Sequence, residues 1–164
     1  MKTKRFGDCD NHAHDDYVAT CGFDSFETDV LDVARFFFLT FSAPPGHSWI
    51  DAFALGEERF GRMMGATMTH SVLHAVQTIR RNRRNPLTFI NPCCAVCAKR
   101  ITQEERYFIT TLHSLRRNQR SEAQMFAMMV CEGQGAADLV TSCIGLDRTW
   151  AFAVAAAESD GASD

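Results

Sequence analysis

The chain has 164 residues, a formal net charge of −3 and a hydrophobic fraction of 46%. This length suits a single domain, which can bury a core without disulfide staples. The longest apolar run, residues 36–41, is far shorter than the roughly 20 residues of a membrane-spanning helix, and no apolar stretch follows the basic first residues. We therefore expect no membrane segment, no secretory signal and a cytoplasmic location.

Charge is unevenly distributed along the chain. Residues 80–120 contain ten basic and two acidic side chains, whereas the remaining residues contain seven basic and eighteen acidic ones. The centre therefore carries +8 and the flanks −11. This asymmetry predicts either an anionic partner or neutralisation of the centre by the acidic segments of the same chain.

The chain is expected to begin with an irregular acidic segment and then to become helical. Residues 1–23 show no apolar period. Asp24 and Glu27 have the spacing of a capping box, and apolar residues follow them at helical intervals, so a first helix is expected over residues 25–41. A Pro-Pro-Gly sequence then ends this helix, because proline cannot continue the hydrogen-bond ladder.

Two further helices are expected in the first half of the chain. One begins near Ser48 and contains Gly56, Gly61 and Gly65 along its course. Each glycine costs a helix about 1 kcal/mol relative to alanine, or else permits close contact with another helix. The next helix is expected over residues 66–84, where an Asn-Pro sequence stops it.

The second half of the chain predicts three more helices. Thr102 and Glu105 form a second capping box. The last helix is expected to be interrupted near Gly145, and residues 158–164 are expected to fray. The three expected helices cover residues 103–117, 121–133 and 134–157. Together the patterns predict one all-α domain of five or six helices over residues 24–157.

The strongest functional signal is the Cys-x-x-Cys sequence at Cys94 and Cys97. Two thiolates separated by two residues can bind one tetrahedral ion through a tight turn, so we expect a metal knuckle between the third and fourth helices. Two more ligands must come from elsewhere in the chain. The predicted ligands are Cys94, Cys97, Cys131 and His113, followed by Cys143 and then by the amino-terminal Cys9, His12 and His14.

Zinc is the expected metal, because sulfur-rich tetrahedral sites usually hold it. An iron–sulfur cluster is the alternative, since Cys93 adds a fourth thiol to Cys94, Cys97 and Cys131. Two other interpretations stay open: a redox dithiol, and buried free cysteines with no ligand at all.

Six arginines of the basic centre are the predicted partner-binding residues. Arginine makes bidentate contacts with carboxylates and phosphates, so either a protein or a nucleic acid suits them. They are Arg80, Arg81, Arg83, Arg84, Arg116 and Arg117.

The sequence favours a small regulatory or adaptor protein with a structural zinc site. An iron–sulfur or thiol-based redox sensor is the first alternative, and a cysteine- or metal-dependent enzyme is the second. Enzymatic activity is the less favoured of these, because the chain lacks a glycine-rich phosphate loop, a Gly-x-Ser-x-Gly elbow and a His-Glu-x-x-His motif. Oligomeric state is not indicated by any pattern.

Overall fold

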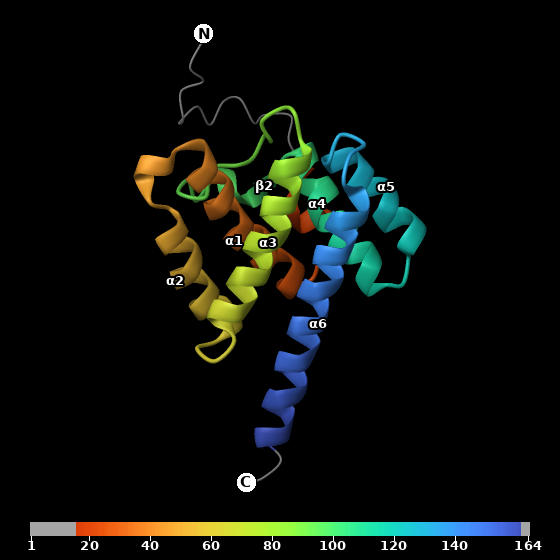
Figure 1. Ribbon diagram of the computed structural model, residues 1–164. Coiled ribbons are helices and arrows are strands. Elements are labelled where there is room, and N and C mark those ends of the chain that lie inside the picture. Colours follow the sequence, from red (N-terminus) through yellow and green to blue (C-terminus); the bar gives the residue numbers. More distant parts are fainter. Residues whose placement is uncertain (1–15, 162–164) are drawn as a thin grey trace.

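The computed structural model describes residues 16–161, which form one helical domain (Figure 1). Within this range the predicted all-α fold is confirmed, with six α-helices and two very short strands. The helices are α1 (Ser25–Ser42), α2 (Trp49–Phe60), α3 (Gly65–Asn82), α4 (Gln103–Arg116), α5 (Arg120–Val130) and α6 (Ala136–Gly161). The strands are β1 (Asp16–Tyr17) and β2 (Arg100–Ile101).

Capping boxes begin two of the helices, as the sequence predicts. At the start of α1, the amide of Glu27 donates to Asp24 Oδ1 at 2.9 Å, and the amide of Asp24 donates to Glu27 Oε2 at 3.0 Å. Thr102 and Glu105 make the same reciprocal pair at the start of α4. Each box satisfies amides that a helix start would otherwise leave without partners, so these two boundaries are fixed locally.

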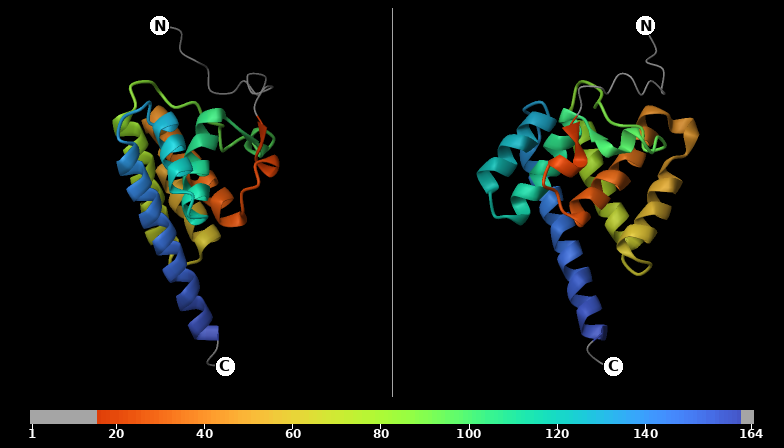
Figure 2. Two further views of the ribbon diagram at one scale, coloured as in Figure 1. Left: turned by 90° about the vertical axis from the view of Figure 1, so that its right-hand side faces the viewer. Right: turned by 180° about the vertical axis from the view of Figure 1, so that it is seen from behind.

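Helix α1 packs against α2, α3 and α4, and the core lies between these helices. Helix α6 packs along α3 (Figure 2). Val30 and Leu31 of α1 are fully buried, as are Val72 of α3, Leu112 of α4 and Leu139 of α6. These apolar side chains recur at helical spacing, so each helix buries one face and leaves the other to solvent.

The sequence predicts Gly56, Gly61 and Gly65 within one helix, but α2 ends at Phe60 and α3 begins at Gly65. The two helices approach each other closely at Gly56 and Gly65. A Cβ atom on Gly65 would lie 2.6 Å from the Cα atom of Glu57, and one on Gly56 would lie 1.7 Å from Thr69 Oγ1. The absent side chains therefore allow the contact. Gly61 has a different role, because it ends α2 with a φ of +80°.

The two strands were not predicted from the sequence. They pair antiparallel, with Asp16 opposite Ile101 and Tyr17 opposite Arg100. The Arg100 guanidinium also lies over the Tyr17 ring, 5.0 Å from its centroid. This pairing fixes the start of the described chain beside the connection between α3 and α4.

Helix α6 is longer and more regular than the sequence predicts. It continues without interruption through Gly145 and runs to Gly161. Its neighbours Cys143 and Leu146 are fully buried, and this packing outweighs the roughly 1 kcal/mol that a glycine costs.

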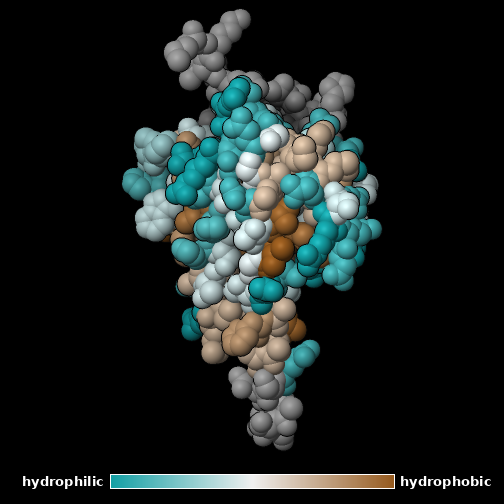
Figure 3. Space-filling model, turned by 45° about the vertical axis from the view of Figure 1, so that its right-hand side comes forward, coloured by the Kyte–Doolittle hydropathy of each residue, from teal (hydrophilic) through white to brown (hydrophobic). Residues whose placement is uncertain are grey.

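The ring of Trp150 on α6 stacks on that of Phe26, with 4.7 Å between the ring centroids. The C-terminal part of α6 extends past the rest of the body (Figure 1). Figure 3 shows apolar residues on this extension, where 71% of Phe152 is exposed. None of the helices in the described part of the chain combines the length and the hydrophobicity that a bilayer crossing demands.

Candidate functional site

Cys94 and Cys97 lie together on one turn in the α3–α4 connection, which comprises residues 83–102. The Cys97 amide donates to Cys94 Sγ at 3.3 Å, and the Ala98 amide donates to the Cys94 carbonyl at 2.8 Å. Cys97 is 6% exposed and opens a short 3₁₀ turn, while Cys94 is half-buried. An amide donating to a sulfur is the second-shell contact that stabilises a thiolate ligand. We call residues 94–97 the cysteine turn.

A buried ion pair between α1 and α4 holds both ends of the segment that carries the cysteine turn. Arg35 Nε donates to Glu105 Oε1 at 2.8 Å. The Arg35 guanidinium also donates to the carbonyls of Ala98 (2.9 Å) and Arg100 (2.6 Å), just after the turn. Before the turn, the Ile90 amide donates to Glu105 Oε1 at 3.1 Å. The pair thus holds the backbone on both sides of the cysteine turn.

The sequence does not single out Arg35 and Glu105 as residues of the site. One signal was present, because Arg35 interrupts the apolar residues of α1, and a charge on a buried face needs a partner. The partner itself could not be identified, since Glu105 lies 70 residues further along the chain.

Cys131 lies away from the cysteine turn, in the core between α5 and α6. It is fully buried, and burial raises the pKa of its thiol to about 11 even though Arg83 nearby lowers it. Cys143 is also fully buried, and burial, followed by the adjacent Cys131, raises its pKa to about 12. Both thiols are packed as small apolar side chains, and the structure does not bring them to Cys94 and Cys97.

His113 lies in the last turn of α4, whereas the α3–α4 connection with the cysteine turn leads into the first turn of that helix. Its Nδ1 lies 2.8 Å from Oε2 of the buried Glu27, which also accepts from Arg116 at 2.7 Å and from Arg117 at 3.2 Å. Burial raises the pKa of Glu27, but hydrogen bonds from His113 and the Asp24 amide outweigh it, so the net pKa is lowered. His113 is therefore part of an ion-pair network and not a neighbour of the cysteine turn.

The four predicted metal ligands do not form a cluster. Within the described residues, no group of three or more His, Cys, Asp and Glu side chains is arranged to hold a metal ion. The structure brings Cys94 and Cys97 together, and it places Cys131 and His113 elsewhere. The remaining candidates, Cys9, His12 and His14, lie outside the described residues.

Three of the six predicted partner-binding arginines make internal ion pairs. The side chain of Arg83 is 5% exposed, and it binds Glu104 and Glu132 and donates to the Val130 carbonyl at 2.6 Å. Arg116 binds acidic residues at the start of α1 and on α6, and Arg117 binds Glu27. Part of the positive charge of the centre is therefore neutralised within the domain.

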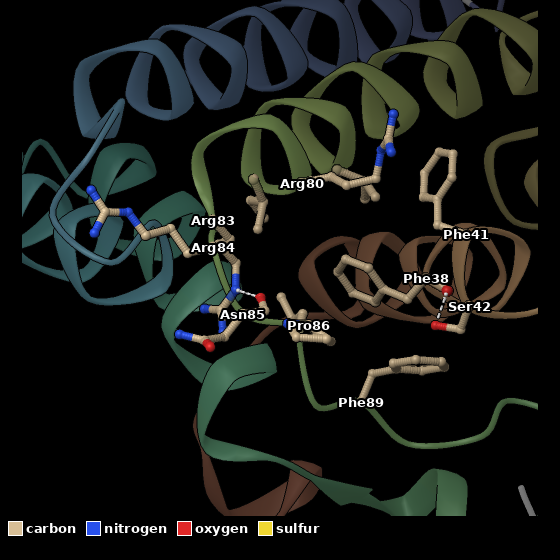
Figure 4. A pocket seen from close by; sticks show the side chains of 12 residues that line it. Phe38, Phe41, Ser42, Arg80, Arg83, Arg84, Asn85, Pro86 and Phe89 are labelled. Carbon is tan, nitrogen blue, oxygen red and sulfur yellow. Dashed lines mark hydrogen bonds between the residues drawn. The ribbon is translucent and has the colours of Figure 1, made fainter. Parts of the chain in front are cut away.

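The other three arginines, Arg80, Arg81 and Arg84, are exposed at the end of α3. Arg80 and Arg84 line a pocket of about 300 Å³ between α1, α3 and the start of the α3–α4 connection (Figure 4). We call it the α1–α3 pocket. The Arg80 guanidinium lies 4.7 Å from the centroid of the Phe41 ring, and its Nε donates to Gln77 Oε1 at 3.2 Å.

The α1–α3 pocket is mostly apolar inside. Phe38, Phe41 and Phe89 line one side, and Arg83, Arg84 and Asn85 line the other (Figure 4). Val76, Ile79 and Leu87 also line the pocket. An apolar interior beside exposed cations suits a ligand that has an apolar group next to a negative charge.

No family model matches this chain, and neither a curated protein nor a solved structure does. The fold and the site therefore define the molecule only as an all-α protein with an arginine-flanked apolar pocket and a preformed cysteine turn.

Proposed function

We propose that this chain is a small adaptor or regulatory protein that binds an acidic segment of a partner protein in the α1–α3 pocket. One apolar side chain of the partner would enter between the phenylalanine rings, and neighbouring carboxylates would meet Arg80 and Arg84. The observation that carries this proposal is the pocket of about 300 Å³ with three phenylalanines inside and exposed arginines beside it. Bidentate arginine–carboxylate contacts give such binding both strength and orientation.

A protein partner is favoured over a nucleic acid. Nucleic-acid affinity comes largely from several phosphate contacts made by unneutralised cations. Here Arg83, Arg116 and Arg117 are already paired with acidic side chains of the same chain. Of the six predicted arginines, only Arg80, Arg81 and Arg84 are exposed and make no ion pair within the described residues, and all three lie near the end of α3. The pocket beside them suits a single side chain better than a row of stacked bases.

The test is an NMR titration of the ¹⁵N-labelled full chain with three probes. The first is a short peptide with a phenylalanine between aspartates and glutamates, and the second replaces those acids by asparagine and glutamine. The third is a single-stranded oligonucleotide. We expect the acidic peptide to shift the amides of Ile79, Leu87 and Phe89, and to bind at least about tenfold more tightly than the neutral one, since tenfold corresponds to about 1.4 kcal/mol.

The combined variant Arg80→Glu/Arg84→Glu should lose this binding. Arg148→Glu is the matched control, because Arg148 is also an exposed arginine but lies on α6. Preferential binding of the oligonucleotide would replace the proposal by a nucleic-acid function. Absence of any shift around the pocket with all three probes would remove the α1–α3 pocket as the site.

We also propose that one zinc ion binds at the cysteine turn and stabilises the domain. Support comes from the proximity of Cys94 and Cys97 and from the Cys97 amide that donates to the Cys94 sulfur. In a structural site the free energy of metal binding adds to the free energy of folding, so a chelator should lower the melting temperature. Identical melting with and without the chelator would contradict this role, and a brown protein would indicate the iron–sulfur alternative.

A further inference from the structure

A second pocket is lined by α4, by α5 and by the segment that precedes α1. Its volume is about 480 Å³, against about 300 Å³ for the α1–α3 pocket, and the two share no lining residue. Small-molecule sites usually measure about 300–1,000 Å³, so this pocket is large enough for a ligand the size of a metabolite. We call it the α4–α5 pocket.

Aromatic rings line the apolar part of the α4–α5 pocket. The Phe23 ring meets the His113 ring edge-on, with 5.5 Å between the ring centroids. The Tyr107 ring of α4 lies 5.9 Å from the Phe126 ring of α5, at an interplanar angle of 32°. The Tyr107 hydroxyl accepts a hydrogen bond from the side-chain amide of Gln103 at 2.5 Å. Rings arranged in this way offer faces and edges to a further ring, so the pocket suits an aromatic ligand.

The polar side chains of the pocket have hydrogen-bonding capacity to spare. Within the described chain, Arg117 makes its hydrogen bonds through Nη1 alone, to Glu27 and His113, so Nε and Nη2 are left for a ligand. The carboxylate of Glu122 has no ion pair or hydrogen bond with any described residue, and neither has the half-buried hydroxyl of Thr110. The pocket therefore offers a cation, an anion and a hydroxyl to a ligand.

These polar groups lie beside the aromatic rings, towards the turn that joins α4 to α5. That turn comprises residues 117–119 only, so the two helices form a hairpin. Tyr107 contacts Phe126 across the hairpin. Thr110 is three residues further along α4 and Glu122 is four residues back along α5, so both lie at the next turn of their helices, on the same faces. Arg117 follows at the turn itself, and the pocket thus has an aromatic part next to a part that carries both charges.

We infer that the α4–α5 pocket binds a free aromatic amino acid. The ring of the ligand packs among Phe23, Tyr107 and Phe126, its carboxylate accepts hydrogen bonds from Arg117, and its ammonium group donates to Glu122. A simple aromatic acid would leave Glu122 without a partner, and an aromatic amine would leave Arg117 without one. Because the ligand contacts three segments of the chain, binding stabilises the folded domain. The inference depends neither on the α1–α3 pocket nor on the zinc ion.

The test is an NMR titration of the ¹⁵N-labelled full chain with three matched probes. L-Phenylalanine has both charged groups, 3-phenylpropionate lacks the ammonium group, and 2-phenylethylamine lacks the carboxylate. We expect L-phenylalanine to shift the amides of Thr110, Gln119 and Phe126, with a Kd of about 1 mM or lower, which is in reach of a ligand of this size. Each truncated probe should bind about 10–100-fold more weakly, because it leaves one charged side chain without its hydrogen-bond partner. The amides of Ile79 and Leu87, in the α1–α3 pocket, should not shift.

Two substitutions assign the charged contacts. Glu122→Gln should weaken L-phenylalanine binding by about tenfold or more and leave 3-phenylpropionate binding unchanged, because that probe has no ammonium group. Arg117→Gln should weaken L-phenylalanine binding in the same way and leave 2-phenylethylamine binding unchanged. The matched controls are Glu57→Gln on α2 and Arg120→Gln at the start of α5, both exposed and both outside the pocket. Each control should bind all three probes like the wild type.

Three results would overturn the inference. The first is the absence of shifts around the pocket with all three probes. The second is an equal affinity for the three probes, because the charged side chains would then contribute nothing. The third is tighter binding of 3-phenylpropionate than of L-phenylalanine, which would exclude Glu122 as the partner of an ammonium group. If Arg117→Gln fails to fold because its contact with the buried Glu27 is lost, Glu122→Gln decides alone, since that carboxylate has no contact to lose within the described residues.

Discussion

Arg35 of α1 and Glu105 of α4 form a completely buried ion pair, with side-chain exposures of 1% and 0% and a distance of 2.8 Å between Nε and Oε1. Their remaining hydrogen-bonding capacity is directed at the backbone of the α3–α4 connection, at Ile90 before the cysteine turn and at Ala98 after it. Because the pair lies between two packed helices, it fixes the backbone of the largely irregular α3–α4 connection relative to them.

Replacing Glu105 by glutamine should destabilise the domain by about 3–5 kcal/mol, because removal of one partner leaves a buried charge uncompensated. The measurement is urea unfolding at neutral pH followed by circular dichroism. The control is Arg106→Gln, which breaks the pair between Arg106 and Asp16, whose side chains are 49% and 59% exposed. That change should cost less than about 1 kcal/mol. Equal losses of unfolding free energy in the two variants would show that the buried pair stabilises the domain no more than the exposed pair.

Gly65→Ala should destabilise the domain by about 1–3 kcal/mol, because the added methyl group would meet the backbone of Glu57 at 2.6 Å and force the helices apart. Gly145→Ala is the matched control. Nothing lies within 4 Å of a Cβ atom there, and the position is inside α6. Alanine should therefore stabilise the protein by about 0.5–1 kcal/mol. Thermal melting of the two variants should move in opposite directions, and a neutral Gly65→Ala would contradict the close α2–α3 contact.

The sequence predicts those features of the fold that arise from residues close together in the chain. Both capping boxes join residues three positions apart, so the starts of α1 and α4 could be placed correctly. Gly145 was judged on propensity alone, and packing of α6 outweighs that propensity.

The candidate site was harder to predict, because its geometry depends on pairs that are distant in sequence. Arginines of identical appearance differ in the structure, since Arg83 meets Glu132 on another helix end while Arg84 stays exposed. Cys131 is one of the predicted metal ligands, but it packs into the core beside Cys143. Neither the pairing of Arg83 nor the burial of Cys131 follows from residue type or spacing, because both depend on contacts between segments that are distant in the sequence.

The distinction between structural and exposed arginines gives a third prediction. Arg83→Met should cost about 1–3 kcal/mol of unfolding free energy, because the Val130 carbonyl and Glu104 would lose a nearly buried donor. Arg81→Met, on the exposed face of the same helix end, should change stability by less than about 0.5 kcal/mol. Chemical denaturation of both variants provides the comparison, and a large loss for Arg81→Met would mean that it too has a structural partner.

Acid should remove the stabilising effect of the Glu27 network. Burial raises the pKa of Glu27, but hydrogen bonds from His113 and the Asp24 amide lower it by more, so its folded pKa lies below the ordinary value of 4.5. A carboxyl group with a lowered folded pKa stabilises the protein fully above its unfolded pKa and loses that effect as the pH falls through the folded one. We expect Glu27→Gln to be less stable than the wild type at pH 7, by about 1–3 kcal/mol, and the gap to narrow below about pH 4.5.

The comparison of the two proteins at each pH is what isolates Glu27. Burial raises the pKa values of Asp29 and Asp32, which therefore oppose the acid loss in the wild type and the variant alike. Urea unfolding between pH 3 and pH 7 gives the difference curve directly. A difference that stays constant across this range would show that ionisation of Glu27 contributes nothing to the difference in stability.

Thiol reactivity gives the last prediction, and it follows from the packing of α6 on the core. Iodoacetamide reacts with thiolates, so a thiol with a pKa of about 11, such as Cys131, should react at least about 100-fold more slowly at pH 8 than one with the ordinary value of 9.0. Cys143, with a pKa of about 12, should react more slowly still, whereas Cys93 is exposed and should be modified first. Mass spectrometry of peptides after timed alkylation measures each site, and the same reaction in urea should modify all three. Equal labelling of Cys143 and Cys93 in the folded protein would mean that α6 leaves the core often enough for its buried face to meet solvent, because a thiol with no exposed surface cannot be attacked while the helix stays packed.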